Sequence, residues 1–140
     1  MEEGSGPVVC SRIKVRYAET DKQGVVYHAN YVIYFEVGRT DFCADAGYPY
    51  PRMEEDGVFI VVTEVRARYR RAATYGDELT VETRFGDFRS RGCSFYYRIL
   101  LPDGGVSAEG ETHHLFLDAA GKPRTVPLAV RKAFETFVRG

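Results

Sequence analysis

The sequence lacks the features that mark a membrane, secreted or nucleic-acid-binding protein. No apolar run in its 140 residues approaches the roughly 18 residues that a membrane-spanning helix needs. The first residues, MEEGSGPVV, are acidic and do not have the basic and then apolar plan of a secretory signal. The formal net charge is −1, so no overall field favours nucleic acid or an anionic membrane as a partner. We therefore expect a cytoplasmic protein that neither spans a membrane nor binds nucleic acid.

Metal-ligating residues are also scarce. The three cysteines, Cys10, Cys43 and Cys93, are odd in number and have neither close pairing nor the spacing of a metal site. Reduced thiols, the usual state in the cytoplasm, are the plain interpretation. His113 and His114 are adjacent, and neighbours on a strand point to opposite faces, so they do not readily bind one ion. The sequence predicts no metal site.

The chain has the length and composition of one ordinary globular domain. It is long enough to bury a core, and its hydrophobic content of 44% and charged content of 28% are typical of such domains. It has no internal repeat, low-complexity tract or internal linker. We expect a flexible N-terminal tail at residues 1–10 and a single domain at residues 11–140.

Alternation of apolar and polar residues predicts several strands, at residues 11–17, 59–69, 78–88, 92–101 and 106–117. Residues 102–105, Pro-Asp-Gly-Gly, are a strong hairpin turn. A helical turn is expected near residues 52–56, and Pro127 suits the first position of a closing helix to about Val138.

One longer stretch has the period of a helix. Asn30 is a candidate N-cap and Gly47 a candidate left-handed end, while Ile33 and Val37 add apolar surface away from the main face. A helix that is apolar on more than one face is normally buried. A single buried helix among many strands indicates an antiparallel α+β domain with the helix on the concave face of the sheet. The main apolar face has intervals of four, three and four: Tyr31, Phe35, Gly38 and Phe42.

A carboxylate and a histidine stand at the entrance of this helix. Asp21 begins a turn that ends at Gly24, and His28 lies just before the helix. A helix N-terminus offers unpaired N–H donors and the positive end of the helix dipole, which stabilise an oxyanion. Gly24 would let the loop approach a ligand without an intervening side chain. Taken alone, Asp21 reads as an ordinary turn residue, so the surrounding motif decides its interpretation.

Residues 17–31, YAETDKQGVVYHANY, resemble the signature of the hotdog-fold acyl-CoA thioesterases of the 4-hydroxybenzoyl-CoA thioesterase-like group. Residues 69–83, YRRAATYGDELTVET, and 110–118, GETHHLFLD, also resemble that family, so the likeness covers about residues 11–137. It implies a hotdog fold, in which an antiparallel sheet wraps around a long central helix. It also implies a homodimer or homotetramer in which sheets join edge to edge and the active site lies at the dimer interface.

The resemblance implies roles for several residues. Asp21 matches the catalytic carboxylate, which acts as nucleophile or as general base for water. The backbone N–H at His28 matches the donor that polarises the thioester carbonyl, and the side chains of His28 and Tyr17 match a catalytic pair. Residues 22–24, Lys-Gln-Gly, depart from the Ala-Gly or Gly-Gly that is common there, which does not argue against activity. Substrate-binding positions are Gly24, Tyr27 and Asn30.

Four arginines near strand ends are candidates to bind the 3′-phosphate and pyrophosphate of coenzyme A: Arg70, Arg71, Arg89 and Arg91. Solvated strand faces are the alternative for each of them. RNA binding through the same charges with Tyr69 and Phe88 is not expected, since the domain is not basic overall. Glu36 and Arg39 are expected to form a local ion pair on the helix or an interface contact, with a supporting role of Glu36 in the site as the alternative.

The sequence thus predicts a hydrolase that cleaves acyl-CoA to a carboxylic acid and free coenzyme A, with no cofactor beyond the coenzyme of the substrate. A non-catalytic acyl-CoA-binding protein and a hydratase or dehydratase of the same fold stay open. Hydratases and dehydratases of this fold have a different motif, which contains the catalytic histidine and a proline, and this chain does not show that motif. Neither the acyl group nor the choice between coenzyme A and acyl carrier protein is determined.

Overall fold

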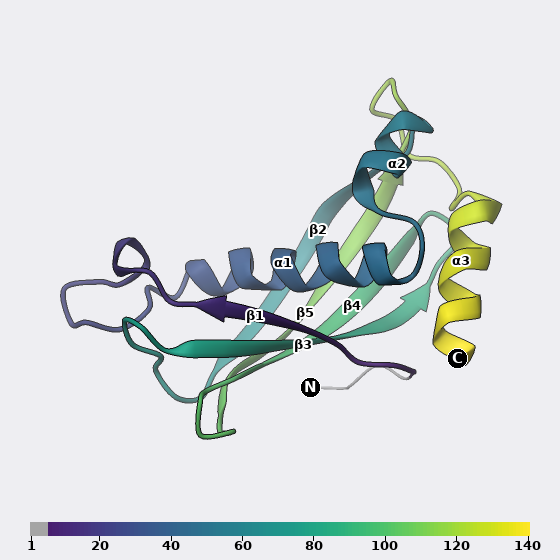
Figure 1. The fold of residues 1–140 in the computed structure, drawn as a ribbon. Helices are drawn as coiled ribbons and strands as arrows, with labels where there is room; N and C mark the ends of the chain where they lie inside the picture. Colours follow the sequence, from purple (N-terminus) through teal and green to yellow (C-terminus); the bar gives the residue numbers. More distant parts are fainter. Residues whose placement is uncertain (1–5) are drawn as a thin grey trace.

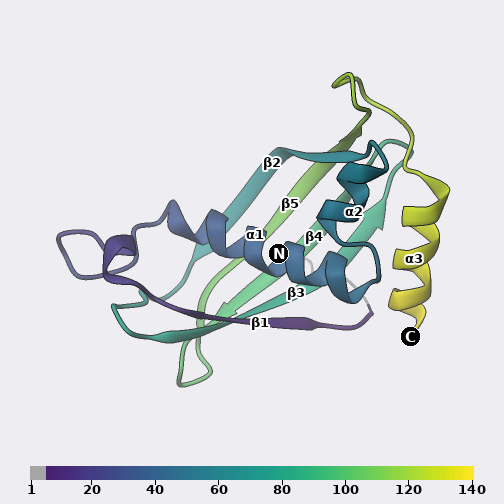
Figure 2. The same cartoon turned by 45° about the horizontal axis from the view of Figure 1, so that its top comes forward.

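A five-stranded antiparallel sheet curls around one long helix in the computed structural model, which describes residues 6–140 (Figure 1). The helix, α1, lies along the concave face of the sheet, and two shorter helices lie near its C-terminal end (Figures 1 and 2). The elements follow in the order β1 Val9–Lys14, the 3-10 helix η1 Tyr17–Glu19, α1 Asn30–Asp45, α2 Tyr50–Glu55, β2 Phe59–Tyr69, β3 Glu78–Phe88, β4 Gly92–Leu100, β5 Val106–Leu117 and α3 Leu128–Arg139.

The strand order in the sheet is β1-β3-β4-β5-β2. Hairpins join β3 to β4 and β4 to β5, the second at the turn predicted for residues 102–105. β2 pairs with β5 at the far edge of the sheet, with Phe59 opposite Leu117 and Tyr69 opposite Ala108. The chain between β2 and β3 therefore crosses from one side of the sheet to the other. The expected antiparallel α+β architecture is confirmed.

Helix α1 buries the face that the spacing predicts: Tyr31, Phe35, Gly38 and Phe42 are all buried. Phe35 stacks on Tyr97 of β4 with ring centroids 4.5 Å apart, and Gly38 packs closely on β3. The helix ends as predicted at Gly47, whose φ is +87°. The Tyr48 N–H donates to the Cys43 carbonyl and the Gly47 N–H to the Ala44 carbonyl, both at 3.0 Å, which satisfies two terminal carbonyls.

Two expectations about α1 are wrong. Ala29, not Asn30, is the N-cap, because the Asn30 side-chain amide donates to the Glu19 carbonyl at 2.9 Å instead of capping the helix. The second concerns burial: Ile33 is 54% exposed and Val37 36% exposed, so one apolar face of the helix is open to solvent in the single chain.

The N-terminal elements also differ from expectation. Of the predicted tail, residues 1–5 lie outside the described residues, while Val9 is buried and begins β1 two residues early. β1 ends at Lys14, and Tyr17 lies in the 3-10 turn η1 instead of a strand. The cause is local: the Arg16 backbone N–H donates to the Glu19 carboxylate at 2.9 Å, which closes the turn.

Smaller differences are shifts of one or two residues at element ends. β4 stops at Leu100, α2 begins at Tyr50, and α3 begins at Leu128 with Pro127 as its N-cap. Within residues 6–140, no helix combines the length and the apolar character that crossing a membrane requires.

Candidate active site

Asp21 lies at the tip of a short hairpin that precedes α1. Its N–H donates to the Val25 carbonyl at 2.9 Å, and the Gly24 N–H donates to the Asp21 carbonyl at 3.0 Å. The carboxylate oxygen Oδ1 accepts the Gln23 N–H at 2.8 Å. Gly24 has φ +84° with open space around it, so the turn geometry requires a glycine here. The other carboxylate oxygen accepts no hydrogen bond from the described residues, which leaves it available to a substrate or water.

Glu19 connects this hairpin to the start of α1, a role that no pattern in the sequence indicates. Its backbone carbonyl accepts the Tyr27 N–H and the Asn30 side-chain amide, both at 2.9 Å. Its carboxylate accepts the hydroxyl of Tyr34, a buried residue of α1, at 3.0 Å, and pairs with Arg16. Burial acts to raise the pKa of Glu19, but hydrogen bonds from the Arg16 backbone, Tyr34 and the Arg16 side chain outweigh it and lower the pKa. The hairpin therefore has a fixed position on the helix.

The start of α1 carries unpaired donors. The Asn30 N–H donates to the Tyr27 carbonyl at 2.9 Å and the Tyr31 N–H to the His28 carbonyl at 3.2 Å. By contrast, the N–H groups of His28 and Ala29 donate no hydrogen bond within residues 6–140. They lie at the positive end of the dipole of a 16-residue helix, which is where an anion is stabilised. The arrangement suits the binding of a developing oxyanion.

A pocket of about 200 Å³ lies beside these donors, lined by Val26, His28, Tyr31, Tyr69, Arg70, Arg71 and Ala72. The structure thus brings together three of the predicted site residues, His28, Arg70 and Arg71. The exposed ring of Tyr27 lies next to that of His28, with centroids 4.5 Å apart. No direct contact joins Asp21 to His28 in the described chain, and Asp21 does not line this pocket.

Arg70 and Arg71 already have acidic partners. Arg70 pairs with Glu109 at 2.5 Å and Arg71 with Asp103 at 2.5 Å; the second pair is well exposed to solvent, whereas the Glu109 side chain is only 22% exposed. A phosphate at this pocket would have to share or displace these carboxylates. An exposed pair such as Arg71–Asp103 contributes little free energy, so its exchange for a phosphate is not costly.

Arg89 and Arg91 lie elsewhere. They line a second pocket of about 640 Å³, which shares no lining residue with the first. Their turn contacts α3, where the Arg131 side chain donates to the Arg89 carbonyl at 3.1 Å. Because α3 packs on Phe42 near the C-terminal end of α1, this turn and His28 lie at opposite ends of a helix about 24 Å long. One chain does not bring the four arginines to one coenzyme.

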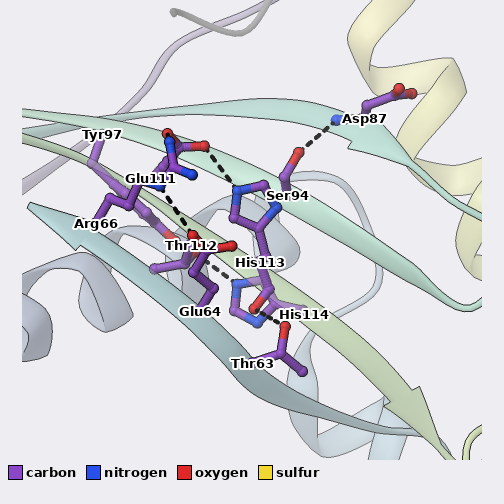
Figure 3. Close-up of polar contacts among 10 residues, drawn as sticks. All are labelled: Thr63, Glu64, Arg66, Asp87, Ser94, Tyr97, Glu111, Thr112, His113 and His114. Atoms are coloured by element: carbon purple, nitrogen blue, oxygen red, sulfur yellow. Dashed lines mark hydrogen bonds and ion pairs between the residues drawn. The ribbon is translucent and has the colours of Figure 1, made fainter. Parts of the chain in front are cut away.

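The two adjacent histidines point to opposite faces of the sheet, as predicted (Figure 3). His113 lies in the second pocket and bonds Glu111 at 2.8 Å, whereas His114 is buried and bonds Thr112 at 2.7 Å. Burial lowers the pKa of His114 to about 3, so its ring is neutral. Among the described residues, no group of three His, Cys, Asp or Glu side chains could hold a metal ion.

Tyr17 does not reach the pocket that His28 lines. Its side chain is 77% exposed, and its ring packs edge-on against Tyr75 with centroids 5.8 Å apart. Tyr17 is therefore not part of the core, and in the single chain it makes no contact with His28 that would support its predicted catalytic role.

Arg39 is, after Glu19, the second residue whose role in the structure was not predicted from the sequence. Its predicted ion pair with Glu36 is present at 3.8 Å, but Arg39 itself is buried. Its guanidinium donates to the hydroxyls of Tyr50 at 3.1 Å and Tyr97 at 3.3 Å. These contacts connect α1, the start of α2 and β4, which indicates a structural role.

Comparison with protein families identifies the fold and the group. Residues 15–134 match the model of the thioesterase-like superfamily. The chain belongs to this superfamily. The resemblance found in the sequence is thereby confirmed, and so is the hotdog fold, which solved thioesterase structures share.

Three relatives illustrate the likeness. A Bacillus subtilis (strain 168) protein to which acyl-CoA thioesterase activity is ascribed, YneP, is 38% identical over 122 residues, 87% of this chain and 86% of that protein. The acyl-CoA thioester hydrolase YbgC of Escherichia coli O6:H1 is 28% identical over 88% of this chain and 92% of its own. The crystal structure of a DHNA-CoA thioesterase from Staphylococcus aureus superposes with a TM-score of 0.87 at 28% identity, covering 92% of this chain and 89% of that one.

Proposed function

We propose that the protein hydrolyses acyl-CoA thioesters to a carboxylic acid and free coenzyme A. The observation that carries the proposal is the start of α1, where the N–H groups of His28 and Ala29 have no partner in the described chain and lie beside a pocket. Membership of the thioesterase-like superfamily supports it, as do relatives that are named for this activity.

In the proposed mechanism the thioester carbonyl oxygen accepts the His28 N–H, and the helix dipole stabilises the negative charge that develops on it. Asp21 then acts in one of two ways. As a nucleophile, its oxygen bonds to the carbonyl carbon, the C–S bond breaks and coenzyme A leaves as the thiolate, after which water hydrolyses the anhydride. As a general base, Asp21 takes a proton from a water whose oxygen attacks the same carbon; the C–S bond then breaks, and coenzyme A leaves as a thiolate that recovers the proton from Asp21. Neither route requires a metal or redox cofactor.

The other predicted site residues have supporting roles in this proposal. Arg70 and Arg71 are proposed to bind phosphates of coenzyme A, and the exposed ring of Tyr27 to contact the substrate. Gly24 and Asn30 support the site indirectly, through the turn and through the Glu19 carbonyl. The catalytic role of the His28 side chain stays a prediction, as does the cytoplasmic location.

We also propose that two copies join along β2, and that Tyr17, Arg89 and Arg91 reach an active site only in such an assembly. β2 is the last strand of the sheet, and one edge of its 11 residues has no partner within the described chain. Four exposed apolar side chains lie on it, and three more on the open face of α1, a pattern typical of a surface that a partner covers. They are Val61, Val62, Val65, Tyr69, Val32, Ile33 and Val37.

The test is hydrolysis of a panel of acyl-CoAs with short, branched and aryl acyl groups. Free coenzyme A should be measured chromatographically, because the exposed thiol of Cys10 would react with a thiol dye. Turnover of at least one acyl-CoA is expected. Binding of acyl-CoA without turnover would favour a non-catalytic acyl-CoA-binding protein. Hydration of an enoyl thioester or dehydration of a β-hydroxyacyl thioester would favour a hydratase or dehydratase.

A further inference from the structure

The last residue of β2 reaches back to the start of α1. The Tyr69 hydroxyl donates a hydrogen bond to the backbone carbonyl of His28 at 3.1 Å. The Tyr69 ring packs edge-on against Tyr31, with centroids 5.3 Å apart, and against His28 at 6.2 Å. Tyr69 therefore contacts the helix start both through its ring and through its hydroxyl.

Hydrogen bonds to β5 and within the segment after β2 fix the position of Tyr69. Tyr69 pairs with Ala108 of β5, and the next backbone N–H, that of Arg70, donates to the Ser107 carbonyl at 2.8 Å. The Ser107 hydroxyl donates to the Arg71 carbonyl at 2.7 Å and also bonds the Tyr31 hydroxyl at 2.8 Å. These contacts tie the segment after β2 to both β5 and α1, so the Tyr69 hydroxyl is held over the His28 carbonyl.

The carbonyl that Tyr69 bonds belongs to the same peptide group as the Ala29 N–H. A trans peptide is planar, and its C=O and N–H point in opposite directions. The His28 carbonyl accepts two donors, the Tyr69 hydroxyl and the Tyr31 N–H at 3.2 Å, which fix the orientation of the plane. Ala29 has helical angles of φ −64° and ψ −23°, so its N–H points beyond the helix N-terminus, as the first N–H groups of a helix do.

We propose that Tyr69 is a positioning residue that orients and polarises the His28–Ala29 peptide, and that the Ala29 N–H is a second donor to the oxyanion beside the His28 N–H. The inference rests on the proposed hydrolysis of a thioester. A hydrogen bond to a carbonyl polarises its peptide and strengthens the N–H as a donor. The benefit grows with the charge on the bound oxygen, so it is larger in the transition state than in the bound substrate.

The kinetic test is Tyr69→Phe, which removes the hydroxyl and keeps the ring. We expect kcat to fall roughly 3- to 10-fold, the effect of one lost hydrogen bond, with KM changed less than about twofold. Tyr48→Phe is the matched control, because it also removes a tyrosine hydroxyl that donates one hydrogen bond, here to Asp56, beyond the C-terminal end of α1. An unchanged kcat, a change in KM alone, or an equal loss in the control would overturn the proposal.

A second measurement does not depend on turnover. In the amide NMR spectrum, the Ala29 proton of Tyr69→Phe should move upfield relative to the unsubstituted protein, because its peptide loses a polarising hydrogen bond. An unmoved Ala29 resonance would refute the orienting role even in an active enzyme. Absence of turnover with every acyl-CoA would instead refute the proposed function, while the NMR shift would still decide whether Tyr69 polarises this peptide.

Discussion

At the scale of single residues, Glu19 holds the candidate site together. Its carbonyl accepts hydrogen bonds from the Tyr27 N–H and the Asn30 side chain. Its carboxylate accepts the Tyr34 hydroxyl and forms an ion pair with Arg16. Hydrogen bonds to an ionised group are stronger than those between neutral groups, so the ionised carboxylate contributes to the stability of the fold. A substitution here should therefore act on stability as well as on catalysis.

The lowered pKa of Glu19 predicts a pH dependence. The folded chain binds fewer protons at Glu19 than the unfolded chain does, so the stability that its carboxylate contributes is present above the ordinary glutamate pKa of 4.5 and is lost as pH falls through the folded pKa. Glu19→Gln should lower the free energy of unfolding by roughly 1 kcal/mol near neutral pH, and by less at low pH where both proteins lack the charge. Urea unfolding at several pH values measures this. A difference between the two proteins that is the same at every pH would contradict it.

At the scale of elements, the packing of α1 on β3 depends on Gly38. A Cβ at this position would overlap Thr83 Oγ1 and approach Val81 Cγ1 to 2.9 Å. The Thr83 hydroxyl is buried and has no hydrogen-bond partner among the described residues, so the hydroxyl itself lowers stability. The glycine is therefore selected by the close approach of helix and sheet, against its poor helix propensity.

Gly38→Ala should destabilise the protein by roughly 1–3 kcal/mol, although alanine is the better helix former, because the added methyl group overpacks the contact. In a Thr83→Ala background the same substitution should cost less, since one of the two overlapping groups is gone. Urea unfolding of the four proteins gives the coupling energy. Equal costs in the two backgrounds would show that Thr83 does not set the distance between α1 and β3.

The elements also show how far sequence reasoning reaches. Alternation found the bounds of β2, β3 and β5, because side-chain period is a local property. The pairing of β2 with β5 was not predictable, since it joins strands that are far apart in the chain. The cap at Ala29 was missed because the amide of Asn30 finds a partner in Glu19, eleven residues earlier. Tertiary contacts of this kind leave no periodic signal.

The same distinction holds for the site. The motif placed His28 correctly at the start of α1, beside Arg70 and Arg71. It could not show that Arg89 and Arg91 lie at the other end of that helix, nor that Glu19 and Tyr69 support its first residues. The sequence predicted the ion pair of Arg39 with Glu36 but not the burial of Arg39, because nothing in its local sequence points to the two tyrosine hydroxyls that accept its hydrogen bonds.

At the scale of the whole molecule, the open edge of β2 and the open apolar face of α1 predict self-association. Val65 is 37% exposed on β2, so a charge there should be tolerated by the single chain. In a pair of copies joined along β2, Val65→Asp would bury a charge and place like charges near each other.

Light scattering should give at least twice the chain mass of 15.8 kDa for the unsubstituted protein, and a value near 15.8 kDa for Val65→Asp. Leu128→Asp is the control, because Leu128 is 68% exposed but lies on α3, away from β2. Unchanged circular dichroism would show that the substituted chains fold. A Val65→Asp protein that keeps its assembly, or a control that loses it, would place the contact elsewhere.

The central claim is that a carboxylate at Asp21 and the donors at the start of α1 act on one thioester, and Asp21→Asn tests it most directly. On the acyl-CoA that the protein hydrolyses best, we expect Asp21→Asn to lower kcat at least about 100-fold, because it removes the nucleophile or general base while keeping the turn. Asp45→Asn, which alters an exposed residue at the far end of α1 that makes no polar contact in the described chain, should leave kcat unchanged. Equal rates for Asp21→Asn and the unsubstituted protein would remove Asp21 from the mechanism and contradict the account.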